Sequence, residues 1–163
     1  MMISSLIRAG VLAIAGLLAL TGCFEKPAAA AFHSIDITGA DYADGFSLTD
    51  HNGQLRTLAD FKGKAVVVFF GFTQCPDVCP TSMSELAQAR KLLGADGDRL
   101  QGLFVSIDPE RDTPEVMKEY IGSFDSTFLA LYAKPGELPD LAKRFKIYYK
   151  KVPGSTPDTY TMD

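Results

Sequence analysis

The sequence predicts an α/β domain with a largely parallel sheet. Two uncharged runs that are rich in β-branched and aromatic residues, Ala65–Phe72 and Leu103–Ile107, are typical of strands buried on both faces. Segments of helical length with recognisable ends follow them, at residues 80–93 and 112–124. Because strands that alternate with helices are joined by crossover connections, their pairing in the sheet should be parallel.

Ahead of these strands the sequence predicts a β-hairpin. Apolar and polar residues alternate from Phe46 to Leu58, on both sides of Asn52 and Gly53. This dipeptide favours a type I′ turn, in which both central residues take positive φ. We therefore expect an N-terminal hairpin before the first buried strand.

Two helices are predicted by their end signals, and three further elements follow them. The first helix spans residues 80–93 and ends at Gly94. Asp112 and Glu115 have the spacing of a capping box with Asp112 at the cap, so the next helix should run to about Phe124. The remaining elements are a strand at 128–132, a helix at 138–145 and a strand at 147–152.

The composition excludes some classes of function. The chain has 163 residues, of which 47% are hydrophobic, and this suits one globular domain. Sixteen basic residues against twenty acidic ones give a net charge of -4, so we expect no nucleic-acid partner. Three cysteines are too few for a small disulfide scaffold, and each needs its own explanation.

The first cysteine, Cys23, lies at the end of a targeting signal. Residues 1–24 carry a single charge, Arg8, and the apolar run that follows is shorter than the roughly 20 residues of a membrane span. Residues 20–23 resemble the lipobox of bacterial lipoproteins, in which Cys23 would be acylated; a signal-peptidase site within residues 28–31 is the alternative.

The lipobox predicts the organisation and location of the chain. We expect a lipoprotein signal peptide at 1–22, a tether at 23–41 and the folded domain at 42–163. A protein of this kind would lie in the bacterial periplasm, held to a membrane by its lipid anchor.

Cys75 and Cys79 stand where the first buried strand leads into the first helix. In a regular helix, residues four apart have Cβ atoms about 5–6 Å apart, which is too far for a relaxed disulfide at about 3.5–4.5 Å. Pro80 disfavours the helical conformation for Cys79, so the helix should begin at Pro80 with Cys79 at its cap. Both sulfurs would then lie at a helix N-terminus, which favours the thiolate.

Two thiolates that can approach each other have two chemical uses. They can interconvert between dithiol and disulfide, or they can bind a soft metal, for which Cu(I) is the natural candidate. An inert structural disulfide is a third interpretation. Three residues between the cysteines, rather than the two of thioredoxin-type oxidoreductases, favour metal binding.

Two motifs carry a resemblance to a known family. The sequences GFTQCPDVCP at 71–80 and VSIDPERDTPE at 105–115 closely resemble the Sco/SenC family of copper chaperones for cytochrome c oxidase assembly. The resemblance implies a thioredoxin-like fold, copper as Cu(I) or Cu(II) bound by Cys75, Cys79 and one histidine, and delivery to the copper-site subunit of the oxidase. The alternative is a thiol-disulfide oxidoreductase that reduces the cysteines of that copper site. Whether the chain is also an enzyme stays open, and we expect a monomer.

The histidine of this ligand set has no counterpart in the sequence. In the family it follows an aspartate in a stretch that Tyr160–Asp163 resembles, and the sequence ends at that aspartate, so we expect that the C-terminal part of the domain is missing. His33 falls in the tether and His51 in the hairpin turn.

Other polar residues near the motifs are weaker candidates. We hypothesise that Asp77 and Asp108 support the cysteines without binding the metal themselves. Capping and loop exposure account for Asp112, and core packing accounts for Met83, one helical turn beyond Cys79.

Overall fold

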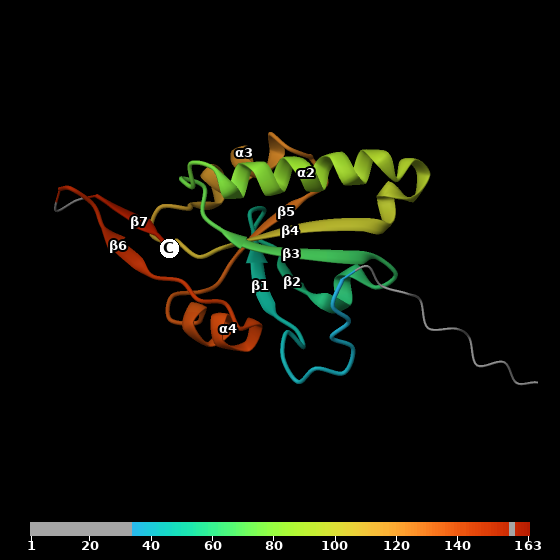
Figure 1. The fold of residues 1–163 in the computed structure, drawn as a ribbon, viewed down its shortest axis with the longest axis horizontal. Coiled ribbons are helices and arrows are strands. Elements are labelled where there is room, and N and C mark those ends of the chain that lie inside the picture. The colour runs from blue at the N-terminus through green and yellow to red at the C-terminus, as the bar shows by residue number, and fades with distance from the viewer. Residues whose placement is uncertain (1–33, 157–158) are drawn as a thin grey trace, which may run out of the picture. The chain divides into compact units, whose positions relative to one another are not determined.

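A five-stranded sheet forms the centre of the molecule. The computed structural model describes residues 34–156 and 159–163. The strands are β1 (Ser47–Asp50), β2 (Leu55–Thr57), β3 (Ala65–Gly71), β4 (Leu100–Ser106) and β5 (Leu129–Tyr132). Their order is β2-β1-β5-β4-β3, in which β3, β4 and β5 are parallel and β1 is antiparallel to both neighbours (Figure 1). The predicted α/β class and the largely parallel sheet are confirmed.

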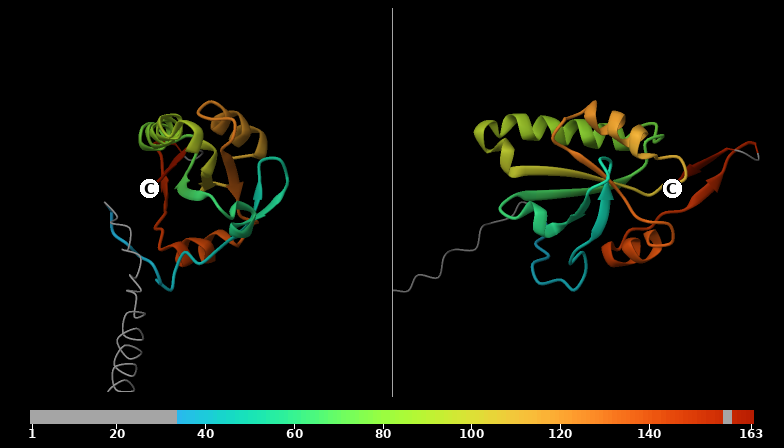
Figure 2. Two further views of the ribbon diagram at one scale, coloured as in Figure 1. Left: turned by 90° about the vertical axis from the view of Figure 1, so that its right-hand side faces the viewer. Right: turned by 180° about the vertical axis from the view of Figure 1, so that it is seen from behind.

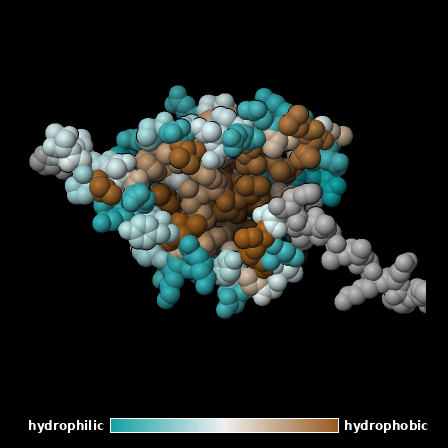
Figure 3. Space-filling model, viewed as in Figure 1, coloured by the Kyte–Doolittle hydropathy of each residue, from teal (hydrophilic) through white to brown (hydrophobic). Residues whose placement is uncertain are grey.

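The two hydrophobic strands differ in burial. β4 is central and its residues from Gln101 to Ser106 are all buried, as predicted. β3 lies at the edge of the sheet, and the Val67 side chain is 37% exposed, so the prediction that this strand is buried on both faces was wrong. Figure 3 shows apolar side chains gathered over this strand. A continuous apolar run does not by itself distinguish an edge strand from a central one.

Helices cover both faces of the sheet. α2 (Val78–Leu92) and α3 (Pro114–Gly122) lie on one face, and α4 (Leu138–Phe145) lies on the other (Figures 1 and 2). Short 3-10 helices, Leu58–Phe61 and Gly94–Arg99, precede β3 and β4. The bounds of α4 are those predicted from the sequence.

Each face of the sheet has its own hydrophobic cluster. Under α4, the buried residues include Leu103, Val105 and Leu131 from the sheet together with Leu138 and Leu141. Under α2 and α3, the cluster joins side chains of both helices to alternate sheet residues: Met83, Ala87, Phe104, Met117, Ile121, Phe128 and Ala130. Alternation along β4 therefore supplies both cores at once.

The N-terminal hairpin is present, but its turn differs from the prediction. β1 and β2 pair as expected, and Gly53 has φ of +80°. Asn52 does not have positive φ, and the N–H of Gly53 donates to the carbonyl of Asp50. The loop is therefore a three-residue turn that ends in a left-handed glycine, which is the next commonest hairpin connection.

A second, two-stranded sheet follows α4. β6 (Lys151–Pro153) and β7 (Tyr160–Met162) are antiparallel. The strand predicted at 147–152 begins later because Lys146 is left-handed, with φ of 56°, and the Ile147 N–H bonds to the Ala142 carbonyl at the end of α4.

Residues 39–163 make up one compact unit. Within the described ranges, no helix combines the length and the apolar character that crossing a membrane requires. The predicted signal peptide, Cys23 and His33 lie outside the described residues.

Candidate dithiol metal centre

The two cysteines lie at the carboxyl edge of the parallel strands. Gly71 and Ser106 are paired at the ends of β3 and β4, so the loops that follow these strands meet at this edge. The first loop carries Cys75 into α2, and the second leads from Ile107 to α3. The parallel pairing of β3 and β4 thus brings the two motifs, which are about 30 residues apart in the sequence, to the same edge of the sheet.

The helix that holds the cysteines begins earlier than predicted. α2 starts at Val78, with Asp77 as its N-cap residue, so Cys79 is in the first helical turn and not at the cap. Pro80 is tolerated there because first-turn N–H groups have no helical partner to lose. The Asp77 side chain makes no capping hydrogen bond.

The two sulfurs are free and unequal in exposure. Cys79 is 5% exposed, whereas Cys75 is half-buried. The N–H of Cys79 donates to the Cys75 sulfur over 3.3 Å, which satisfies one of the unpaired N–H groups of the helix start. The loop therefore presents Cys75 toward solvent and keeps Cys79 behind it.

The surroundings shift the two pKa values in opposite directions. Burial raises the pKa of Cys75, but hydrogen bonds from the Cys79 thiol and from the N–H groups of residues 77–79 outweigh it, so the net pKa is lowered. Burial also raises the pKa of Cys79, and the hydrogen bond with Cys75 raises it further, together with the charge on Asp112. Cys75 is the group that forms a thiolate first.

Gly71 leaves room for the buried thiol. A Cβ at this position would lie 3.0 Å from the Cys79 sulfur and 2.9 Å from the Phe69 ring, closer than well-packed atoms approach. The close approach explains why the strand that leads to the cysteines ends in glycine.

The prediction that Asp112 is the exposed cap of the helix was wrong. Asp112 is 3% exposed rather than an exposed cap, and the cap of α3 is Thr113, whose side chain accepts from the Val116 N–H. The Asp112 carboxylate instead accepts from the Thr73 hydroxyl and from the Ser106 hydroxyl, both over 2.6 Å, and from the Thr73 N–H. It ties the start of the cysteine loop to the end of β4.

Asp108 and Arg111 connect the cysteine loop to the C-terminal hairpin. Asp108, 2% exposed, forms an ion pair with Arg111 and accepts from the Tyr160 hydroxyl over 2.8 Å. Arg111 Nη1 donates to the Gln74 side chain over 3.1 Å and to the Tyr160 carbonyl over 2.9 Å, and its guanidinium lies 3.7 Å from the Tyr160 ring centre. We call Asp108, Arg111 and Tyr160 the clasp.

The other candidate residues, Asp77, Met83 and His51, lie in three different parts of the molecule. Asp77 is exposed beside the cysteines, and Met83 is fully buried in the core, as predicted. His51 is held in the hairpin turn, where its Nδ1 accepts from the Ala130 N–H. Ala130 lies toward the amino end of β5, whereas the cysteines lie at the carboxyl edge of the parallel strands. Among the described residues, no group of three His, Cys, Asp or Glu side chains is arranged to hold a metal ion.

One sulfur at this edge was not singled out from the sequence. Met162, in β7, packs on the buried cluster of Phe72, Cys79 and Ile107, and so does Cys75. The two thiols are soft donors, so the dithiol suits a soft ion such as Cu(I) rather than a hard cation.

Comparison with known proteins decides the family. The family model described as SCO1/SenC matches residues 36–163. The chain belongs to the SCO1/SenC family. Within this family, an SCO2-like protein of Rickettsia prowazekii is 35% identical over 119 residues, covering 72% of this chain and 58% of that protein. The mitochondrial SCO2 homolog of Bos taurus is 37% identical over 120 residues, covering 72% and 45%. The chain therefore spans about half the length of these relatives.

Solved Sco structures share the fold. Bradyrhizobium japonicum ScoI, determined with copper bound, is 45% identical with a TM-score of 0.67, covering 73% of this chain and 75% of that one. Yeast Sco1 with copper bound is 34% identical with a TM-score of 0.65, covering 73% and 67%. The thioredoxin domain of a Bacteroides vulgatus oxidoreductase, 24% identical with a TM-score of 0.53, shows the same fold, which confirms the thioredoxin-like class.

Proposed function

We propose that the chain binds copper through Cys75 and Cys79 and serves in the assembly of the copper site of cytochrome c oxidase. The observation that carries the proposal is the free dithiol at the carboxyl edge of β3, on a fold that it shares with Sco proteins solved with copper bound. The receiving partner would be the copper-site subunit of the oxidase, because the chain belongs to a family of cytochrome c oxidase assembly proteins. The copper ion is cargo in this function.

The geometry gives each cysteine its own task. Cys75 is half-buried and has the lower pKa, so it is the first thiolate to meet an incoming ion and the one that a partner can reach. Cys79 is buried and has the raised pKa, so it gives up its proton only when the ion compensates the charge. Capture of Cu(I) by both sulfurs releases the protons that the thiols carried, and transfer reverses these steps one ligand at a time.

An anaerobic titration tests this function. The reduced full chain should bind one equivalent of Cu(I) in competition with a chromophoric chelator, and the chain oxidised to the Cys75–Cys79 disulfide should bind none. The reason is that a disulfide has no thiolate to offer. Equal binding by the reduced and oxidised forms would contradict the assignment.

The unequal pKa values favour a second candidate, a thiol-disulfide oxidoreductase. A solvent-accessible thiol with lowered pKa beside a buried partner is the arrangement that attacks a disulfide and then resolves the mixed disulfide. The same preparation distinguishes the two functions. If it reduces a disulfide-bonded peptide of the oxidase copper site but retains no Cu(I), the second function replaces the first.

We also propose that the mature chain is a lipoprotein on the periplasmic side of a bacterial membrane. The support is the resemblance of residues 20–23 to a lipobox, with a basic residue and an apolar run before it. Mass spectrometry of the mature N-terminal peptide should find acylated Cys23, and Cys23→Ser should abolish the modification. An unmodified N-terminus within residues 28–32 would show ordinary signal-peptidase cleavage instead.

A further inference from the structure

The N-terminal hairpin meets the parallel strands along a short seam between β1 and β5. The register of this seam covers two residue pairs and ends at Asp50 and Leu131. His51 and Ala130 come next, and they exchange two hydrogen bonds. The His51 N–H donates to the Ala130 carbonyl over 2.9 Å, and the Ala130 N–H donates to His51 Nδ1 over 3.1 Å. In a regular antiparallel pair both acceptors are main-chain carbonyls, so an imidazole nitrogen here replaces a carbonyl oxygen.

The bond to the imidazole exists only while His51 is neutral. An Nδ1 that accepts a hydrogen bond has no proton, so the ring carries its proton on Nε2; in the charged ring both nitrogens are donors. Ala130 is fully buried, at 0% exposed. Its N–H therefore cannot turn to solvent, and a buried donor that loses its acceptor costs free energy. Protonation of His51 thus removes one of the two bonds by which this pair extends the seam.

Titratable groups from four elements lie around the imidazole. They are Asp50 of β1, Arg56 of β2, Lys118 of α3 and, on the same face of β5 as Ala130, Tyr132. Burial lowers the pKa of His51 below its ordinary value of 6.5; the charge on Asp50 opposes this effect, whereas the charges on Lys118 and Arg56 add to it. A group whose pKa is lowered in the folded state stabilises the fold above its ordinary pKa, and this contribution is lost as the pH falls through the folded-state pKa. The seam is therefore strongest near neutral pH and weaker in acid.

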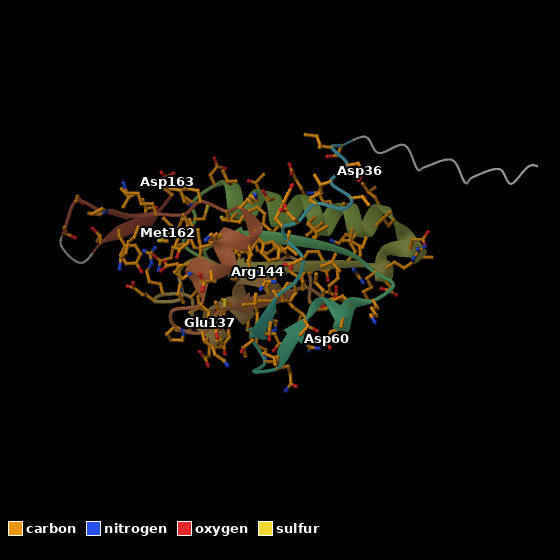
Figure 4. The ribbon with its side chains drawn as sticks, turned by 90° about the horizontal axis from the view of Figure 1, so that it is seen from below. Asp36, Asp60, Glu137, Arg144, Met162 and Asp163 are labelled. Carbon is orange, nitrogen blue, oxygen red and sulfur yellow. The ribbon has the colours of Figure 1, made fainter. Side chains whose placement is uncertain are left out.

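The elements on the two sides of the seam are each held by other contacts. β1 pairs with β2 over three residue pairs, and β5 pairs with β4 over three. We propose that His51 is a pH-dependent latch: the neutral imidazole secures the β1–β2 hairpin to β5, and protonation releases it, so that the seam opens locally. The latch is separate from the dithiol edge. Figure 4 shows the hairpin strands, in teal beside Asp60, on the other side of the domain from Met162 and Asp163 at the end of β7.

Two substitutions separate the acceptor from the charge. The side-chain oxygen of His51→Asn can accept from the Ala130 N–H and does not titrate, whereas His51→Ala offers no acceptor at any pH. Urea unfolding of the full chain at about pH 7.5 and about pH 5, on either side of the ordinary histidine pKa, measures the effect. Between these pH values, the folding equilibrium constant of the unaltered chain should fall about 5-fold or more beyond its fall in His51→Asn. An equal fall in the two proteins would overturn the proposal.

A matched control and a third variant complete the unfolding experiment. The chain has two histidines, and His33→Asn, at the other one, should keep the pH dependence of the unaltered chain. His51→Ala should be less stable than His51→Asn at the higher pH, because the Ala130 N–H then has no acceptor. Loss of the pH dependence in His33→Asn would assign the effect to the wrong histidine and contradict the latch.

NMR gives a readout that does not depend on the stability of the variants. In the unaltered chain the neutral His51 ring should carry its proton on Nε2, and the Ala130 amide resonance should shift with the same midpoint as the titration of that ring. The protection of the Ala130 amide against hydrogen exchange should fall in acid relative to the protection of the β4 amides. A ring proton on Nδ1, or an Ala130 resonance that does not follow the ring titration, would refute the inference.

Discussion

Cys75→Ser and Cys79→Ser should each abolish tight binding of Cu(I). A serine hydroxyl stays protonated at neutral pH and is a hard donor, so each variant keeps a single thiolate for the ion. The affinity should fall by more than the about 10- to 100-fold that follows when a metal ligand merely loses a supporting hydrogen bond. Chelator competition under argon measures the change, and circular dichroism checks that each variant is folded.

A neighbouring substitution provides the control for the cysteine variants. Val78 lies between the two cysteines in the first turn of α2 and is 65% exposed, so Val78→Ala alters the same loop and leaves both sulfurs in place. Its Cu(I) affinity should equal that of the unaltered chain. Retention of full affinity by Cys79→Ser would show that the ion is bound elsewhere.

Asp112→Ala should destabilise the fold by about 3 kcal/mol. The carboxylate accepts from the hydroxyls of Thr73 and Ser106 and from the Thr73 N–H at a buried position. Each buried donor left without a partner costs about 1–3 kcal/mol, and part of this is recovered when hydroxyls rotate or water enters. Against a total stability of about 5–15 kcal/mol, the loss is large. Urea unfolding followed by circular dichroism measures it.

Two further variants sharpen the Asp112 result. Asp112→Asn keeps one acceptor oxygen, so it should lower the free energy of unfolding by less than Asp112→Ala does. Because the charge on Asp112 raises the pKa of Cys79, that pKa should fall in Asp112→Asn. Asp96→Asn removes a carboxylate whose ion pair with Arg99 is exposed, and it should change the free energy of unfolding by less than about 1 kcal/mol. If Asp112→Ala changes the free energy of unfolding as little as Asp96→Asn does, the buried hydrogen bonds of Asp112 do not secure the cysteine loop.

The sequence predicted what depends on local pattern. The bounds of α4 are those predicted at residues 138–145, and the dithiol followed from two cysteines beside prolines at a strand-to-helix junction. The start of α2 was missed by two residues because Pro80 was read as opening the helix, whereas its missing N–H is harmless anywhere in the first turn.

Features that depend on tertiary contacts were not predictable in the same way. The spacing of Asp112 and Glu115 fits a capping box, but Thr113 also caps well, and only the approach of Thr73 and Ser106 decides which of the two is buried. Met162 reads as an ordinary strand residue until β7 is placed beside the cysteine loop. Edge and central strands likewise look alike until their pairing is known.

The hairpin of β6 and β7 lies outside the hydrogen-bonded ladders of the central sheet. Over residues 150–154 and 159–163, its main-chain bonds run between its own strands, and the clasp attaches it through side chains. Such a segment opens locally at a lower free energy than a central strand such as β4, with which it shares no ladder. Motion of the hairpin beside the cysteine loop therefore requires no unfolding of the central sheet.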